Sequence, residues 1–270
     1  MICYHHNDLD GYCSASLVNM ASFDNVEMRE ITYSDKIDID SIPEGTEVYI
    51  VDYHIEPDMM DELIEKCTVH WIDHHKTAIE KYKDYPHEVK GIRRVGVGAC
   101  ELVYEYLEDK LPYKGIPFYV ELISDWDVWK FDFGDLTKYF KYAMDAFVDG
   151  PKDKLWHELT DDLVDDLAKK GELIYIGIKQ NYKNTLKKIG FETTFEGYDV
   201  IACNAVANSE MFEDEDYPFY ITFNFDGDFY TISLYSEKVD VSEIAKKYGG
   251  GGHEGAAGFI TKELPFEKSW

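Results

Sequence analysis

The sequence predicts an α/β protein in which two domains are joined by a helical linker. Short apolar runs alternate with segments of helical spacing over the first half of the chain, and this alternation favours a mainly parallel sheet flanked by helices. Apolar residues then recur at helical spacing from 152 to 188, and paired apolar runs follow. We therefore expect an N-terminal domain over 1–149, a linker over 150–190 and a smaller α/β C-terminal domain over 191–270.

Five apolar runs in the N-terminal part are interpreted as strands. The expected strands are 1–4, 28–33, 46–52, 69–72 and 119–123, and the expected helices begin near Ser14, at Asp58 and beyond Gly98. Parallel strands need a crossover segment between them, and a helix of about a dozen residues supplies one. Ligands of such sheets bind at the carboxyl ends of the strands.

The C-terminal part is expected to contain a strand at 198–203 and a helix at 240–248. Two apolar runs, 219–225 and 229–234, flank Asp226-Gly227-Asp228. This arrangement is a strong signal for a β-hairpin.

Composition restricts the partners of the protein. The formal net charge is −27, and Arg29, Arg93 and Arg94 are the three arginines. Such a surface repels a long polyanion, so we expect no extended duplex nucleic acid as partner. No run of about 18 apolar residues and no secretory leader is evident, so we expect no membrane contact and a cytoplasmic protein. The oligomeric state stays open between monomer and dimer.

Several expected strand ends carry residues that bind metal ions. The residues are His6, Asp8 and Asp10, then Asp52, then Asp73, His74 and His75, and finally Asp125 or Asp127. Six or seven nitrogen and oxygen ligands exceed one tetrahedral site and suit two divalent cations bridged by a carboxylate. The alternative is that these are ordinary polar residues at the starts of loops.

In this order the motifs resemble the DHH phosphoesterase superfamily, with Asp73-His74-His75 as the eponymous trio. The segment from Gly250 to Gly258, with Gly252-His253 in its middle, is similar to the glycine-rich motif of the DHHA1 domain. The opening His6-Asn7-Asp8-Leu9-Asp10-Gly11 resembles members of the nanoRNase B type. The resemblance implies a catalytic DHH domain, a substrate-binding DHHA1 domain and hydrolysis of phosphodiesters with Mn²⁺. Two ions are implied, with Mg²⁺, Co²⁺ or Fe²⁺ as other possible metals.

The resemblance also implies roles for single residues. His6 and Asp8 would bind one ion, Asp10 and His74 the other, and Asp52 would bridge the two. Asp125 would complete the second site, with Asp127 as its rival on the same segment.

His75 would contact the phosphate or the leaving oxygen. Asp73 would orient a histidine, in the way that metal sites commonly hold their imidazoles.

Substrate contacts are expected elsewhere in the chain. Successive glycines can form a concave nest of backbone N–H donors for an anion, so Gly250, Gly251 and Gly252 are candidates, with His253 as a further donor. A flexible tether is the alternative for this run. Arg93 and Arg94 are candidate phosphate or base contacts, although an ordinary surface pair is nearly as good an interpretation.

Three aromatic residues beside the expected fourth motif complete the candidates. Trp126, Trp129 and Phe131 could stack a base, although buried packing fits at least two of them.

These observations predict a phosphodiesterase that hydrolyses short oligonucleotides, or linear or cyclic dinucleotides, to mononucleotides by two-metal activation of a bridging water. One alternative is a single-strand-specific exonuclease of the RecJ type. Another is a protein that senses or sequesters a nucleotide without cleaving it. A pyrophosphatase uses a similar N-terminal domain but lacks the glycine-histidine motif.

Overall fold

The computed structural model describes residues 1–32, 35 and 37–266. The chain divides into two compact units, Met1–Tyr175 and Ile176–Trp270. The division falls inside the longest helix, α8 (Asp161–Ile189), which follows the short α7 (Leu155–Glu158). These two helices occupy most of the expected linker, and the domain boundaries given above stay a prediction.

The N-terminal unit contains a four-stranded parallel sheet. Its strands are β1 (Ile2–His5), β2 (Glu27–Glu30), β3 (Glu47–Val51) and β4 (Thr68–Ile72), in the order β2-β1-β3-β4. All three strand pairings are parallel, which confirms the predicted sheet. The strand expected at 28–33 corresponds to β2, and Tyr33 lies outside the described residues.

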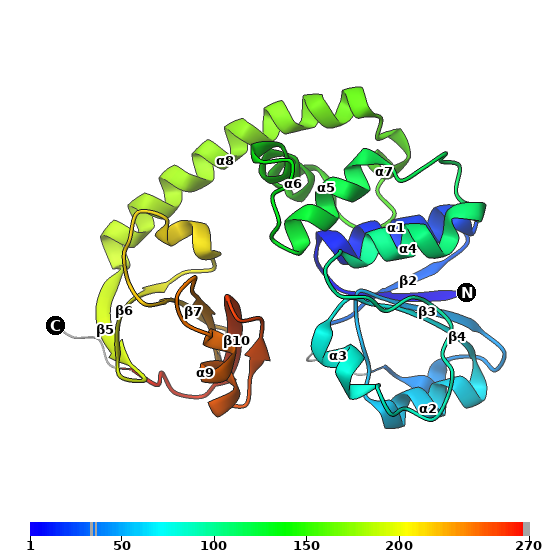
Figure 1. Cartoon of the computed structure of the whole chain (residues 1–270), viewed down its shortest axis with the longest axis horizontal. Coiled ribbons are helices and arrows are strands. Elements are labelled where there is room, and N and C mark those ends of the chain that lie inside the picture. The colour runs from blue at the N-terminus through cyan, green and yellow to red at the C-terminus, as the bar shows by residue number, and fades with distance from the viewer. Residues whose placement is uncertain (33–34, 36, 267–270) are drawn as a thin grey trace. The chain divides into compact units, whose positions relative to one another are not determined.

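Helices cover both faces of this sheet (Figure 1). One face carries α1 (Leu9–Ala21), α4 (Ala99–Leu107) and α5 (Phe118–Asp127), and the other carries α2 (Pro57–Lys66) and α3 (Lys76–Lys81). Successive strand residues alternate between the faces. Val51 and Ile72 therefore join the core beneath α1, and Ile50 and Trp71 join the core above α2. Helix α6 (Asp135–Phe147) packs against α5.

The prediction of a strand at 119–123 is wrong, because these residues lie within α5. Tyr119, Val120, Leu122 and Ile123 are all buried. A short apolar run of this kind has the same appearance in a buried strand and in a buried helix, so periodicity alone cannot separate them. Pro117 at the N-cap suits a helix start.

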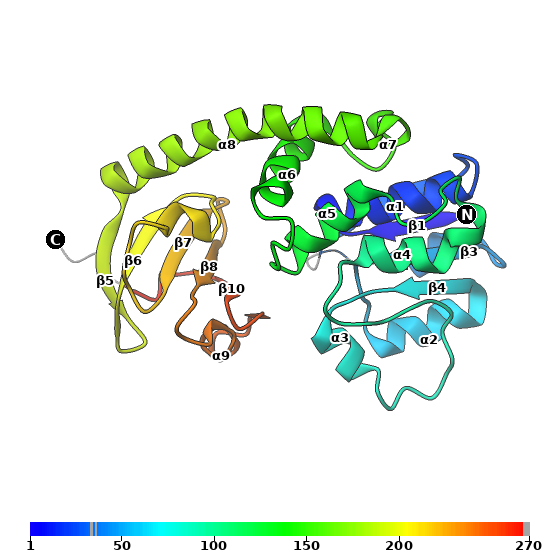
Figure 2. The ribbon, with the colours of Figure 1, turned by 45° about the horizontal axis from the view of Figure 1, so that its top comes forward.

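The C-terminal unit contains a six-stranded mixed sheet in the order β5-β6-β7-β8-β10-β9 (Figure 2). Its strands are β5 (Phe191–Phe195), β6 (Tyr198–Asn204), β7 (Tyr220–Phe225), β8 (Tyr230–Tyr235), β9 (Gly251–Gly252) and β10 (Ala256–Thr261), and α9 spans Val241–Lys247. Strands β6 and β7 are parallel, and the other pairings are antiparallel.

The predicted hairpin is present between β7 and β8. Asp226 Oδ1 accepts hydrogen bonds from the N–H groups of Asp228 and Phe229 and so closes the turn. Short 3₁₀ helices occur at Ile39–Ser41, Glu108–Lys110 and Ser209–Phe212. Among the helices of the described residues, none has the length and hydrophobicity of a membrane span.

Candidate metal centre

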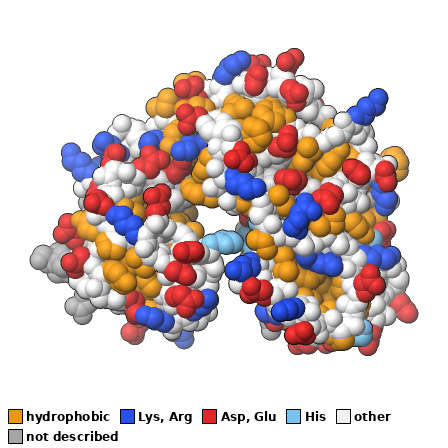
Figure 3. All heavy atoms as spheres, in the orientation of Figure 1, with side chains coloured by type: hydrophobic (Ala, Val, Ile, Leu, Met, Phe, Trp, Pro, Cys, Tyr) orange, Lys and Arg blue, Asp and Glu red, His pale blue; other side chains and the backbone are white. Residues whose placement is uncertain are grey.

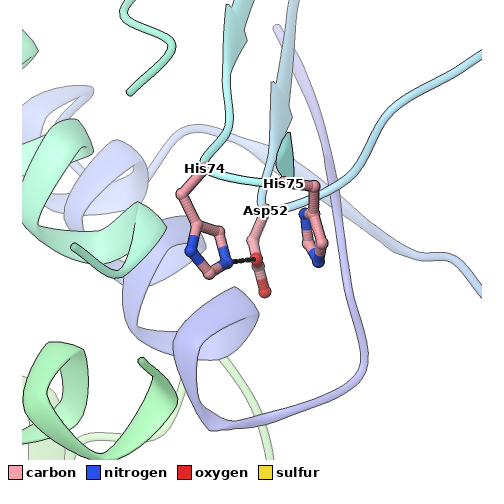
Figure 4. A group of neighbouring side chains, drawn as sticks. All are labelled: Asp52, His74 and His75. Carbon is pink, nitrogen blue, oxygen red and sulfur yellow. Dashed lines mark ion pairs between the residues drawn. The ribbon is translucent and has the colours of Figure 1, made fainter. Parts of the chain in front are cut away.

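Polar side chains converge at the carboxyl ends of three neighbouring strands of the N-terminal sheet. His6 follows β1, Asp52 follows β3 and His74 follows β4. Because the three strands are parallel and adjacent, their ends meet at one edge of the sheet. Figure 4 shows the Asp52 carboxylate between the imidazole rings of His74 and His75.

Asp52 is the centre of this arrangement. Its Oδ1 lies 3.3 Å from His74 Nε2, and its Oδ2 lies 4.0 Å from His6 Nδ1. The backbone at Asp52 is left-handed, with φ of 53°, a conformation that aspartate tolerates better than most residues. This turn directs the carboxylate between two histidines that come from different strands.

Potential ligand atoms form three overlapping groups in the part of the chain that the structure describes. The groups are His6, Asp8 and Asp52; Asp52, His74 and His75; and Asp10, His74 and Asp127. The structure thus brings together every predicted metal ligand except Asp125. Their assignment as ligands stays a prediction.

Asp10 is held by the start of α4, which the sequence analysis did not anticipate. Its buried carboxylate accepts hydrogen bonds from the N–H groups of Ala99 at 2.6 Å and Cys100 at 2.8 Å. These groups have no partner inside the helix and favour an anion. Residue 98, just before α4, packs too closely against α5 for a side chain, since a Cβ at Gly98 would lie 2.9 Å from Ser124 Cα. The small residues Gly96, Gly98 and Ala99 before a helical segment are the sequence signal for this contact.

Asp125 does not face the other candidate ligands, and the prediction that it completes the second site requires correction. Its carboxylate accepts hydrogen bonds from the N–H groups of Asp132 and Phe133 and from the Thr137 hydroxyl. Asp127 instead lies with its Oδ2 3.2 Å from His74 Nε2. Two residues on a helix differ by about 200° in direction, so only one of these carboxylates can face the cluster. Asp127 is the one that faces the cluster.

Asp73 and His75 form a hydrogen-bonded pair beside the cluster. The fully buried Asp73 places its Oδ1 2.7 Å from His75 Nδ1 and accepts the His74 N–H at 2.8 Å. Burial would lower the pKa of His75, but the bond to Asp73 and its charge raise it above the usual value. His54 also lies here, with its ring centroid 6.4 Å from that of His75; the sequence analysis did not select it.

The cluster has the properties expected of a cation site. Oδ2 of Asp52 is buried and accepts no hydrogen bond from the described residues. Burial raises the pKa of Asp52 well above its ordinary value, and the carboxylates of Asp8 and Asp10 raise it further. A divalent cation removes this repulsion and supplies the missing partner. The mixture of carboxylate and imidazole ligands suits divalent ions of the first transition row.

Part of the glycine run is already hydrogen-bonded within the C-terminal unit, and the contact of the run with an anion stays a prediction. The N–H groups of Gly249 and Gly250 donate to carbonyls of α9, and the His253 N–H donates to Ala256 O. Gly251 and Gly252 form β9 and pair with β10. The side chain of His253 is exposed, and its proposed contact with substrate stays a prediction.

The two candidate arginines lie in different surroundings. Arg93 Nη1 donates to Trp71 O at 3.0 Å, and its guanidinium lies 5.2 Å from the Trp71 ring centroid. Arg94 makes a two-pronged ion pair with Glu105 on the surface. The contacts of both arginines match structural roles, and their role in substrate binding stays a prediction.

Comparison with known proteins identifies the C-terminal domain and the fold. A family model for the DHHA1 domain matches residues 187–268. "Uncharacterized protein R106" of Acanthamoeba polyphaga mimivirus is 26% identical over 98% of this chain, which spans 61% of the length of that relative.

Two solved structures have a similar fold. The pGpG-specific phosphodiesterase PggH of Vibrio cholerae is 14% identical, with a TM-score of 0.50 and coverage of 97% of this chain and 93% of that one. An exopolyphosphatase-related protein of Bacteroides fragilis is 14% identical, with a TM-score of 0.52 and coverage of 97% and 87%. Residues 187–268 thus match the DHHA1 domain family, and the chain as a whole has the fold of these two structures.

Proposed function

We propose that this protein is a metal-dependent phosphodiesterase that hydrolyses short oligonucleotides or dinucleotides to mononucleotides. The observation that carries the proposal is the position of Asp52, which belongs to two ligand groups and places one oxygen near His74 and the other near His6. A carboxylate shared in this way is the usual bridge between two catalytic cations.

Each residue of the centre has a proposed task. His6 and Asp8 would hold one cation, Asp10, His74 and Asp127 would hold the other, and Asp52 is placed to serve both. Two bound cations, which we expect to be Mn²⁺, would make a water molecule acidic and bind phosphoryl oxygens.

The pair of Asp73 and His75 acts on the substrate in this proposal. Asp73 fixes the orientation of the His75 ring through Nδ1. His75 then donates a hydrogen bond to the phosphate or to the leaving oxygen, which helps that oxygen to depart.

Charge favours a small substrate. Acidic residues outnumber basic ones 54 to 27 in the sequence, and acidic side chains are spread over the face drawn in Figure 3. The free energy for binding long nucleic acids comes largely from neutralising many phosphates with cationic side chains. A substrate with one to a few phosphates needs only the cations of the centre.

The test is a digestion panel with purified protein and Mn²⁺. The panel holds labelled RNA and DNA of 2 to about 24 nucleotides, linear and cyclic dinucleotides, pyrophosphate and polyphosphate. Rapid release of mononucleotides from the shortest substrates, lost on chelation and in Asp52→Asn, is the expected result.

Other outcomes would assign a different activity. Equal or faster cleavage of long single strands would indicate an exonuclease of the RecJ type and contradict the charge argument. Tight binding of a dinucleotide without cleavage would indicate a sensing or sequestering protein. Cleavage of pyrophosphate or polyphosphate alone would exclude the nucleotide substrate.

A further inference from the structure

The segment that follows Asp127 has an unusual backbone. It joins α5 to α6, and three of its residues have left-handed φ values: 57° at Trp129, 57° at Phe131 and 61° at Gly134. Glycine adopts this region freely, but bulky aromatic residues do so at a cost in free energy. Such strain persists where the surrounding structure enforces it, and it concentrates at functional sites.

Asp125 is the residue that enforces this conformation. Its carboxylate accepts the N–H groups of Asp132 and Phe133, and its backbone carbonyl accepts the N–H of Lys130 at 3.0 Å. The Thr137 hydroxyl bonds to the same carboxylate. The Asp125 carboxylate, which the resemblance implied as a metal ligand, thus fixes the conformation of the loop that carries Trp129.

Trp129 is half exposed, at 50% of its full accessible surface. Its ring meets Trp126 and Phe131 edge to face, with centroids 4.9 and 4.8 Å apart. Trp126 and Phe131 are partly buried, so packing accounts for them. Packing explains the burial of only half of the Trp129 side chain. The other half of this large apolar ring is exposed to water, at a cost in free energy.

Two lysines of α6 lie against this aromatic cluster. Lys138 Nζ lies 5.8 Å from the Phe131 ring centroid, and Lys141 Nζ lies 4.8 Å from that of Trp126. Lys141 also pairs with Asp145 at 2.5 Å. Aromatic rings interleaved with cationic side chains are the means by which proteins hold single-stranded nucleic acids without reading their sequence.

The chain connects this cluster directly to the metal centre. Trp129 is two residues after Asp127, so their Cα atoms are at most about 7 Å apart, and Asp127 contacts His74. We infer that Trp129 stacks on a nucleobase of the substrate whose phosphate is held at the metal centre. The inference rests on the proposed function and selects nucleotides over polyphosphate as the substrate class, since polyphosphate has no base to stack.

A matched pair of ligands isolates the contribution of the base to binding affinity. Adenosine 5′-monophosphate and ribose 5-phosphate carry the same phosphate and sugar, and neither contains a phosphodiester. Calorimetric titration of the whole protein with each, in the presence of Mg²⁺, measures the contribution of the base without turnover. We expect the nucleotide to bind about tenfold more tightly, the ratio that stacking of one base typically supplies.

Variants at position 129 locate the effect. Trp129→Gly removes the ring and retains access to the left-handed backbone, so loss of the ring is separated from misfolding of the loop. We expect it to bind both ligands equally, whereas Trp129→Phe keeps most of the preference.

Phe23→Gly is the matched control. Phe23 is 92% exposed and left-handed, with φ of 54°, but it follows the far end of α1, about 20 Å along the helix from Asp8. This variant should bind both ligands as the wild type does.

The outcomes separate this inference from the proposed function. Equal binding of the two ligands by the wild type, or an unchanged preference in Trp129→Gly, overturns the inference even if phosphodiesters are cleaved. A preference that disappears in Trp129→Gly supports the stacking site even in a protein that cleaves nothing in the digestion panel.

Discussion

Oδ2 of Asp10 lies 2.6 Å from the backbone nitrogen of Ala99, which is 89 residues further along the chain. Together with Cys100, this contact joins the first polar motif to the start of α4. The carboxylate therefore has a task in folding besides its proposed task in binding a metal ion.

We expect Asp10→Ala to destabilise the metal-free protein by about 2 kcal/mol, because two buried N–H groups lose a charged acceptor. Urea unfolding in the presence of a chelator measures this change. Asp127→Asn is the control, since no such contact to a helix start is lost there, and its metal-free stability should be at least that of the wild type because one of the mutually repelling carboxylates is neutralised. Equal loss in both variants would contradict a separate folding role for Asp10.

Asp125 and Asp127 should respond in opposite ways to replacement by asparagine. Asp127→Asn is expected to reduce the rise in melting temperature that we expect Mn²⁺ to produce, because the ligand group with His74 loses one of its charges. Asp125→Asn is expected to lower stability by about 1–2 kcal/mol through its lost hydrogen bonds and to keep a response to Mn²⁺. Differential scanning fluorimetry with and without Mn²⁺ compares them, and the reverse pattern would restore Asp125 as the ligand.

Asp73 and His75 should behave as one functional unit. We expect Asp73→Asn to lower kcat by about 10- to 100-fold, the usual cost of removing a residue that orients an active-site imidazole. His75→Gln should lower it at least as much. The double variant should be little worse than His75→Gln alone, because Asp73 acts through that ring. Additive losses would show that the two residues act separately.

The glycine run offers a neighbouring pair of substitutions with different expected effects. A Cβ at Gly250 would collide with Gly258 O and Phe259, whereas one at Gly251 meets nothing within 4 Å. We expect Gly250→Ala to destabilise the C-terminal unit by roughly 1–3 kcal/mol and Gly251→Ala to have little effect. Thermal unfolding of both variants tests this. Equal stability combined with weaker substrate binding would instead favour the anion nest.

Much of the site follows from the sequence because the ends of parallel strands must meet. Asp52 and His74 end neighbouring strands, so a short polar motif after each apolar run was enough to place them together. The choice between Asp125 and Asp127 as the metal ligand does not follow from the sequence. In a strand, residues two apart face the same way, so either carboxylate could be the ligand. In a helix they face apart, and the apolar run at 119–123 predicts a strand where the structure has α5.

Contacts distant in sequence were beyond prediction for a different reason. The bonds from Ala99 and Cys100 to Asp10 depend on where α4 begins in space. The position of Gly251 and Gly252 in β9 depends on their pairing with β10. Local sequence patterns specify which hydrogen-bonding groups a segment offers. Tertiary contacts decide which of these groups already have a partner within the protein.

Asp52 and His74 each belong to two of the three ligand groups found among the described residues. Two cations held by these groups would therefore not bind independently. The first would use a side chain that the second also needs, and it would change the charge around the second site. The two binding affinities would then be linked, and replacing Asp52 or His74 should weaken binding at both sites instead of at one.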